Sequence, residues 1–229
     1  MNAASEQVTA NPMLSGTSLR AVSALVLAVP ALASVYFGPP WFTALVLVSA
    51  ALMGWEWTRM CSGKPLWLFA GAFYICLPCA ALIWLRNDSF SGMITILWIF
   101  AIVWSADSAA YIAGRAIGGP KLAPRISPKK TWAGFIGGIG FASIVGGGFA
   151  LYWDGSPLNL ALWSGAVAIA SQAGDLLESI IKRHFGVKDS SQLIPGHGGV
   201  LDRVDALIIA SLAVALLKIT TGKSVMPWR

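Results

Sequence analysis

Long apolar stretches separated by short polar segments dominate the chain. Because about 20 apolar residues in a helix cross the hydrocarbon core of a bilayer, each stretch of that length predicts a transmembrane helix. Seven such stretches cover residues 20–37, 41–58, 66–85, 92–114, 131–153, 158–181 and 204–221. The pattern therefore predicts an all-α fold, a polytopic integral membrane helical bundle with about seven transmembrane helices and no sheet. The stretch after residue 20 is expected to be a retained span, because the polar leader with Glu6 does not match a signal peptide.

Composition supports a membrane protein. Hydrophobic residues make up 56% of the 229 residues and charged residues only 11%, whereas a soluble domain carries about 25% charged residues. The formal charge of +6 is explained better by loops beside an anionic leaflet and by an anionic substrate than by nucleic acid, so no nucleic-acid partner is expected.

The distribution of lysine and arginine orients the predicted bundle. With the N-terminus inside and the spans alternating, twelve of the sixteen basic residues fall on the inner side. This asymmetry predicts that the inner loops face the cytoplasm of a bacterial cell, with the protein in the inner membrane. An odd number of spans leaves the basic C-terminal residues outside, and this disagrees with the rule that basic residues lie on the inner side.

The two halves of the chain differ in their content of ionisable groups. Residues 1–100 contain few, and they are predicted to form a hydrophobic scaffold of transmembrane helices. Residues 101–229 contain the long inner loops and seven of the ten acidic residues, so this part is predicted to be the catalytic region, with a site that faces the cytoplasm.

A polar stripe marks the inner end of the sixth stretch. Asp175, Glu178, Ser179 and Lys182 recur at helical spacing, which places them on one face of a helix otherwise rich in alanine and isoleucine. Such a stripe inside a membrane protein favours a site in the bundle interior or a wet cavity. The alternative is an Asp–Lys pair that neutralises itself at the interface.

A glycine-rich segment with two carboxylates follows. The glycines of Pro195-Gly196-His197-Gly198-Gly199 could form a cradle of amides for phosphate, or simply a turn. Asp202 and Asp205 begin the last stretch, where carboxylates are favoured at a helix start. Alternatively they bind a hard cation such as Mg²⁺, which prefers carboxylate oxygens.

A second polar cluster lies upstream. Asp107, Tyr111 and Gly114 share one helix face, and Arg115 follows. Lys129 and Lys130, flanked by hydroxyl residues, precede the fifth stretch, where a helix N-terminus can bind an anion. Lysines beside a span can equally serve as inside anchors.

Three segments, in this order, resemble the phosphatidate cytidylyltransferase (CDP-diacylglycerol synthase) family. They are Asp107-Ser-Ala-Ala-Tyr111-Ile-Ala-Gly114-Arg115, Ser127-Pro128-Lys129-Lys130-Thr131-Trp132, and Ser179-x2-Lys182-Arg183-x4-Lys188-Asp189-x-Ser191-x2-Ile194-Pro195-x-His197-Gly198-Gly199-x2-Asp202-Arg203-x-Asp205. One departure is Ala133, where the family usually has glutamate. The resemblance covers residues 105–210, and the N-terminal half is short for the family.

The resemblance implies transfer of CMP from CTP to phosphatidate, giving CDP-diacylglycerol and pyrophosphate in phospholipid biosynthesis. It implies that Asp175 and Asp202 hold Mg²⁺, with a second cation left open, and that Asp175, Lys182, Asp202 and Asp205 are catalytic. The other residues expected to bind substrate are Asp107, Arg115, Ser127, Lys129, Lys130, Ser179, Arg183, Lys188, His197, Gly198, Gly199 and Arg203. Expected partners are CTP, phosphatidate and membrane lipids, and a homodimer stays open.

Two alternatives remain. A CTP-dependent polyprenol or phytol kinase would transfer the γ-phosphoryl group and release CDP. An ion-coupled anion transporter would place its acids near mid-span, whereas Asp189 and Asp202 are predicted in or beside a loop.

Overall fold

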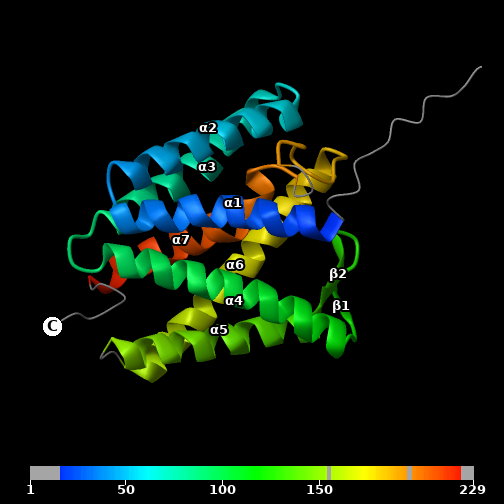
Figure 1. The fold of residues 1–229 in the computed structure, drawn as a ribbon. Helices are drawn as coiled ribbons and strands as arrows, with labels where there is room; N and C mark the ends of the chain where they lie inside the picture. Colours follow the sequence, from blue (N-terminus) through cyan, green and yellow to red (C-terminus); the bar gives the residue numbers. More distant parts are fainter. Residues whose placement is uncertain (1–15, 154–155, 195–197, 223–229) are drawn as a thin grey trace, which may run out of the picture.

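Seven helices run back and forth in the part of the chain that the computed structural model describes, residues 16–153, 156–194 and 198–222 (Figure 1). Their bounds are α1 Gly16–Phe37, α2 Trp41–Cys61, α3 Pro65–Arg86, α4 Gly92–Ala116, α5 Trp132–Tyr152, α6 Pro157–His184 and α7 Leu201–Thr221. Each one coincides with an apolar stretch of the sequence, so the predicted helical bundle is confirmed.

Five of these helices, α3 to α7, are long and apolar enough to cross a membrane. Leu25–Phe37 within α1 is a shorter apolar helix, and α2 falls outside this group because Trp55, Glu56 and Trp57 lower its hydropathy. Many large apolar side chains of the spans are exposed, among them Ile144 and Leu216, as expected for helices that face lipid. The chain is therefore an integral membrane protein, but the count of seven spans is not confirmed.

The expectation of no sheet is wrong. Strands β1 (Lys121–Ala123) and β2 (Ser127–Thr131) form an antiparallel pair between α4 and α5, with Lys121 opposite Thr131. The segment contains Pro120, Pro124 and Pro128. Proline lacks an amide hydrogen and disfavours a helix, so a short strand pair satisfies the remaining backbone groups.

The two ends of the bundle are held differently. At one end, Arg86 donates two hydrogen bonds to the carbonyl of Val35, at 2.9 and 2.7 Å, and Lys218 pairs with Asp88. The opposite end carries the turn between α2 and α3, the β1–β2 hairpin and the loop between α6 and α7, here called the α6–α7 loop (residues 185–200) (Figure 1). The polar segments singled out in the sequence lie toward this second end, as far as the structure describes them.

Candidate active site

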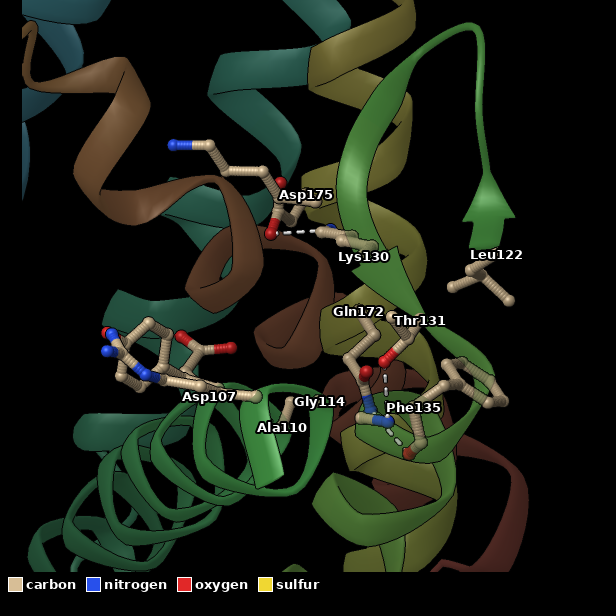
Figure 2. Close-up of a pocket in the computed structure, with 13 residues that line it drawn as sticks. Asp107, Ala110, Gly114, Leu122, Lys130, Thr131, Phe135, Gln172 and Asp175 are labelled. Carbon is tan, nitrogen blue, oxygen red and sulfur yellow. Dashed lines mark hydrogen bonds and ion pairs between the residues drawn. The ribbon is translucent and has the colours of Figure 1, made fainter. Parts of the chain in front are cut away.

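A polar cavity of about 550 Å³ lies where α4, β2, α5 and α6 meet (Figure 2). Its walls combine acidic and basic side chains with small residues. The charged and polar residues that line it are Asp107, Tyr111, Arg115, Lys129, Lys130, Thr131, Gln172 and Asp175. The structure therefore brings the two upstream segments and the start of the α6 stripe to one cavity.

An ion pair spans this cavity. Lys130 Nζ on β2 lies 2.6 Å from Asp175 Oδ2 on α6, and both side chains are partly exposed. The Ser179 hydroxyl, one turn further along α6, lies 3.5 Å from Asp175 Oδ1. The Nζ atom of Lys130 is itself buried in this pair, so a phosphate would have to displace the carboxylate of Asp175 to reach it.

The cavity depends on close contact between α4 and α5. The side chain of Thr131 accepts a hydrogen bond from the amide of Gly134 at 3.1 Å and so caps the N-terminus of α5. A Cβ at Gly134 would lie 2.6 Å from the carbonyl oxygen of Ala110, too close for any side chain. The glycine allows α5 to pack directly on α4, which fixes where β2 presents its lysines.

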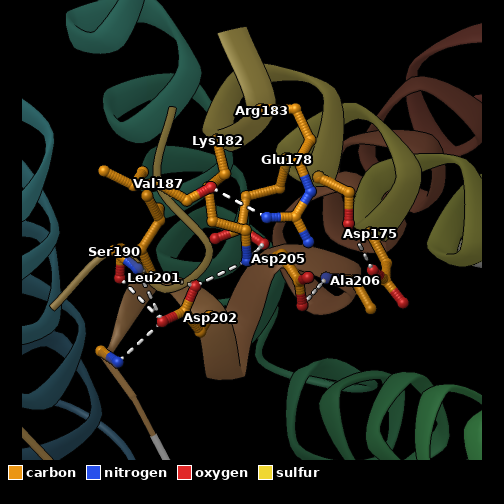
Figure 3. A network of polar contacts seen from close by, with 12 residues as sticks. Asp175, Glu178, Lys182, Arg183, Val187, Ser190, Leu201, Asp202, Asp205 and Ala206 are labelled. Carbon is orange, nitrogen blue, oxygen red and sulfur yellow. Dashed lines mark hydrogen bonds and ion pairs between the residues drawn. The ribbon is translucent and has the colours of Figure 1, made fainter. Parts of the chain in front are cut away.

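Lys182 joins α6 to α7 deeper in the protein (Figure 3). Its Nζ lies 2.7 Å from Glu178 Oε2 and 2.7 Å from Asp202 Oδ1, and its side chain is only 11% exposed. Asp202 also accepts hydrogen bonds from the amides of Ser190, at 2.9 Å, and Gly199, at 2.8 Å. Lys182 and Asp202 are thus held in place by groups from both helices and from the α6–α7 loop.

Carboxylates gather between the polar cavity and this network. Asp107, Asp175 and Asp205 lie close enough to repel one another, while Lys130 and Arg203 attract Asp107. Asp205 is buried and also contacts the fully buried Glu178. Carboxylates that are gathered in this way can all be ionised only where cations compensate their charge.

An apolar cavity of about 540 Å³ adjoins the polar one. Its walls come mainly from α1, α2, α3, α4 and α7, and Asp107 lines both cavities. Arg203 supplies the positive charge at its wall. An apolar chamber with one arginine beside a polar chamber suits a molecule that has an anionic head and an apolar tail.

Several predicted residues occupy other positions. Arg183 donates to the carbonyls of Ile126, at 3.4 Å, and Val187, at 3.0 Å, so it ties α6 to the hairpin and the α6–α7 loop. Lys188 is exposed on this loop. His197 lies outside the described residues.

The glycine segment and Ser127 have structural contacts of their own. Gly198 has a φ of 83°, and its carbonyl accepts a hydrogen bond from the amide of Ile194 at 2.8 Å. Gly199 uses its amide to bind Asp202 rather than leaving it free. Ser127 begins β2, where it pairs with Ala123 and is absent from the wall of the polar cavity.

Sequence reasoning missed Glu56 and Ser190, and it placed Ser191 in the family signature without assigning a contact to it. Glu56 is fully buried on α2 and accepts hydrogen bonds from both serines, more than 130 residues further along the chain. A single acid inside an apolar helix is itself a signal of a functional contact. Glu56 could therefore have been singled out from the sequence, but its hydrogen-bond partners could not have been deduced from it.

Comparison with known proteins agrees with this geometry. A sequence model described as the cytidylyltransferase family matches residues 64–220, which include both cavity-lining segments and the network around Lys182. The chain belongs to this cytidylyltransferase family. The match begins after Glu56, so that residue lies outside the part that the family model covers.

Individual relatives point the same way. The chain is 48% identical over 180 residues to a phosphatidate cytidylyltransferase of Brucella suis, covering 75% of this chain and 63% of that relative. Over 214 residues it is 36% identical to a phosphatidate cytidylyltransferase of Rickettsia bellii, with 90% of this chain and 92% of the relative covered. A third, from Haemophilus influenzae, is 32% identical, with 83% and 94% covered. The chain thus spans less than two thirds of the Brucella relative but nearly the whole length of the other two.

Proposed function

We propose that the chain is a phosphatidate cytidylyltransferase, which transfers CMP from CTP to phosphatidate and gives CDP-diacylglycerol and pyrophosphate. The observation that carries this proposal is the junction of the two cavities at Asp107. The polar cavity, with Arg115, Lys129 and Lys130, suits a triphosphate, and the apolar cavity with Arg203 suits a lipid phosphate and its chain. The names of the relatives support the same assignment.

The reaction asks the protein for charge compensation and positioning. An oxygen of the lipid phosphate attacks the α-phosphorus of CTP and forms a new P–O bond, while the bond to pyrophosphate breaks and pyrophosphate leaves with the electron pair. Two anions must approach each other, so cationic side chains and correct alignment account for most of the catalysis. In this proposal Lys130 and Lys129 bind the triphosphate and Arg203 binds the lipid phosphate. Lys182, which lines neither cavity, adds positive charge from the buried network with Glu178 and Asp202.

Among the described residues no group of three His, Cys, Asp or Glu side chains is arranged to hold a metal ion, but the carboxylates near the polar cavity have the chemistry that a hard divalent cation prefers. Asp107, Asp175 and Asp205 repel one another, and carboxylate oxygens are the ligands that Mg²⁺ prefers. Asp175 would hold Mg²⁺, with help from Asp107 or Asp205, after giving up its contact with Lys130, and Asp202 would do so only by giving up its contact with Lys182. Mg²⁺ bound there would neutralise charge on the triphosphate and on the departing pyrophosphate.

We further propose that the site opens to the cytoplasm of a bacterial cell, with the protein in the inner membrane. The end of the bundle that carries the hairpin and the α6–α7 loop holds most of the lysine and arginine residues, whereas Arg86 and Lys218 lie at the other end. Excess positive charge on one side of the bundle marks the cytoplasmic side. CTP would reach the site from that side. A homodimer stays a prediction.

Lipid-dependent release of pyrophosphate tests the function. Purified protein in mixed micelles is supplied with CTP, Mg²⁺ and phosphatidate, and pyrophosphate is measured with and without the lipid. We expect release only when phosphatidate is present; its absence with intact wild-type protein would contradict the proposal.

A matched pair of variants tests the site. Asp202→Asn is expected to lower turnover, because the substitution weakens the hold on Lys182 and removes a candidate ligand of the metal. Thr58→Ala, an exposed change on α2, serves as the control. Turnover in Asp202→Asn equal to that of the control would remove Asp202 from the site.

A further inference from the structure

Glu56 connects the N-terminal helices to the α6–α7 loop. Its carboxylate is fully buried and accepts four hydrogen bonds, all from the α6–α7 loop and the first turn of α7. The donors are the hydroxyls of Ser191 (2.6 Å) and Ser190 (3.2 Å) and the amides of Val200 (2.8 Å) and Leu201 (2.8 Å). These donors satisfy both oxygens of a group that is costly to bury.

The two amides belong to the start of α7. The first amides of a helix have no partner within it and carry a partial positive charge, so a carboxylate is favourable there. Glu56 caps α7 from another helix and so fixes where α7 begins relative to α2. Asp202, in the first turn of α7, is positioned by the same contact.

Ser190 links Glu56 to Asp202. Its hydroxyl lies 3.2 Å from Glu56 Oε2 and 3.0 Å from Asp202 Oδ2, and its amide also donates to Asp202. Asp202 in turn lies 2.7 Å from Lys182 Nζ (Figure 3). A continuous series of contacts therefore runs from α2 through the α6–α7 loop to the buried lysine.

Gly199 shows how closely the α6–α7 loop packs on the carboxylate. A Cβ built at this position would collide with Ser190 Oγ and with Glu56 Oε1. Close packing against Ser190 and Glu56 therefore explains why this position has no side chain. The amide of Gly199 separately donates a hydrogen bond to Asp202.

We propose that Glu56 is a positioning residue for the reaction: it holds the α6–α7 loop and the first turn of α7 so that Asp202 keeps Lys182 in place for the substrate phosphates. This role rests on the proposed function. It gives the N-terminal helices a part in catalysis without contact to substrate, through a residue outside the segment that the family match covers. A simple structural brace would lower stability when it is removed, whereas a positioning residue also lowers turnover in protein that remains folded.

Three variants separate these roles. Glu56→Gln keeps the size of the side chain but replaces one acceptor oxygen with a donor, and Glu56→Ala removes every contact. Ser191→Ala removes one bond to Glu56 and the acceptor of the Leu193 amide, and it is expected to fold even if Glu56→Ala does not. Thr58→Ala, on the same helix but exposed, is the control.

Hydrogen exchange measured by mass spectrometry, without substrate, reports on the contact itself. We expect residues 198–201 to exchange faster in Glu56→Gln and Ser191→Ala than in Thr58→Ala, because the amides of Val200 and Leu201 open more often when their hold on Glu56 weakens. Exchange equal to that of the control in both variants would overturn the proposal.

Steady-state kinetics report on the role in the reaction. A hydrogen bond to a charged group is worth about 1.5–3 kcal/mol, so we expect kcat to fall about tenfold in Ser191→Ala and about a hundredfold in Glu56→Gln. The KM for CTP is expected to change by no more than about twofold, because the cavity that binds the triphosphate lies elsewhere. Glu56→Ala, if folded, should be slower than Glu56→Gln.

The outcomes distinguish the two proposals. Active wild-type protein with normal kcat in Glu56→Gln and Ser191→Ala would overturn the positioning role alone. Wild-type protein that releases no lipid-dependent pyrophosphate would overturn the proposed function and this role with it.

Discussion

Replacement of Lys182 by methionine tests the buried charge network most sharply. The lysine is the direct cationic partner of both Glu178 and Asp202, at 2.7 Å from each. Glu178 is fully buried, and the side chain of Asp202 is only 5% exposed. Methionine fills most of the same space but leaves two carboxylates without their cation.

The magnitude follows from this burial. Loss of one partner from a buried ion pair costs about 3–5 kcal/mol, far more than loss of a surface pair. For a chain of this length each kcal/mol lowers the melting temperature by about 2–4 °C, so Lys182→Met should melt roughly 6–20 °C below wild type. Adding Glu178→Gln removes one of the unpaired charges and should restore about half of this loss.

Thermal unfolding in detergent, monitored by tryptophan fluorescence, measures these differences. Lys188→Met, an exposed lysine six residues away, is the matched control and should shift the melting temperature by no more than about 2 °C. The double variant should regain stability but not turnover, because the cation proposed to act on the phosphates is still missing. Equal melting temperatures for Lys182→Met and Lys188→Met would refute the reasoning.

Three further predictions concern other parts of the molecule. The hydrogen bond from Lys218, with help from backbone amides, lowers the pKa of Asp88 to about 2, so its ionised form stabilises the fold above about pH 4 and this contribution is lost as the pH falls toward 2. Asp88→Asn should therefore lower the melting temperature at pH 6 but bring little difference from wild type near pH 2; an equal difference at both would contradict this. Gly146→Ala should destabilise the protein by about 1–3 kcal/mol, because its Cβ would collide with Ser164 on α6. Gly148→Ala, with open space around it, is the control and should not destabilise it. Equal effects of the two substitutions in denaturant titrations would contradict the close packing of α5 on α6. Lys130→Met should raise the KM for CTP about tenfold or more through loss of one charge-assisted contact, and an unchanged KM would exclude Lys130 from the nucleotide site.

Much of the fold could be predicted from hydrophobic length alone. Each apolar stretch of about 20 residues became a helix, because a helix satisfies its own backbone in an apolar environment. Length did not settle which helices cross the membrane, since α2 combines apolar residues with Glu56 and three tryptophans. It also gave no hint of β1 and β2, which form because three prolines interrupt the segment after α4.

The candidate site was predictable where its residues are close in sequence. Helical spacing placed Asp175, Ser179 and Lys182 on one face of α6. The structure has Asp175 at the polar cavity, Ser179 next to Asp175, and Lys182 in the buried network. Spacing could not show which cation each acid would meet: Asp175 pairs with Lys130, and Asp202 pairs with Lys182. Such pairings depend on how helices pack over long chain separations, which a single sequence does not encode locally.

The contribution of the first hundred residues was the largest omission. They were predicted to be a hydrophobic scaffold, and their division from residues 101–229 stays a prediction. Glu56 nevertheless reaches from α2 to the start of α7, and α1 and α2 help to line the apolar cavity. The role of a single buried acid can be assigned only when its hydrogen-bond donors are known, and the donors to Glu56 lie more than 130 residues further along the chain.

The position of the label transferred from CTP tests the central claim most directly. Purified protein is incubated with phosphatidate, Mg²⁺ and CTP labelled at either the α- or the γ-phosphorus, and radioactivity is measured in the extracted lipid. The account predicts that α-label enters the lipid and γ-label leaves as pyrophosphate. Entry of γ-label, with CDP as the product, would instead identify a CTP-dependent lipid kinase. If neither the α-label nor the γ-label enters the lipid, the transfer reaction itself is contradicted.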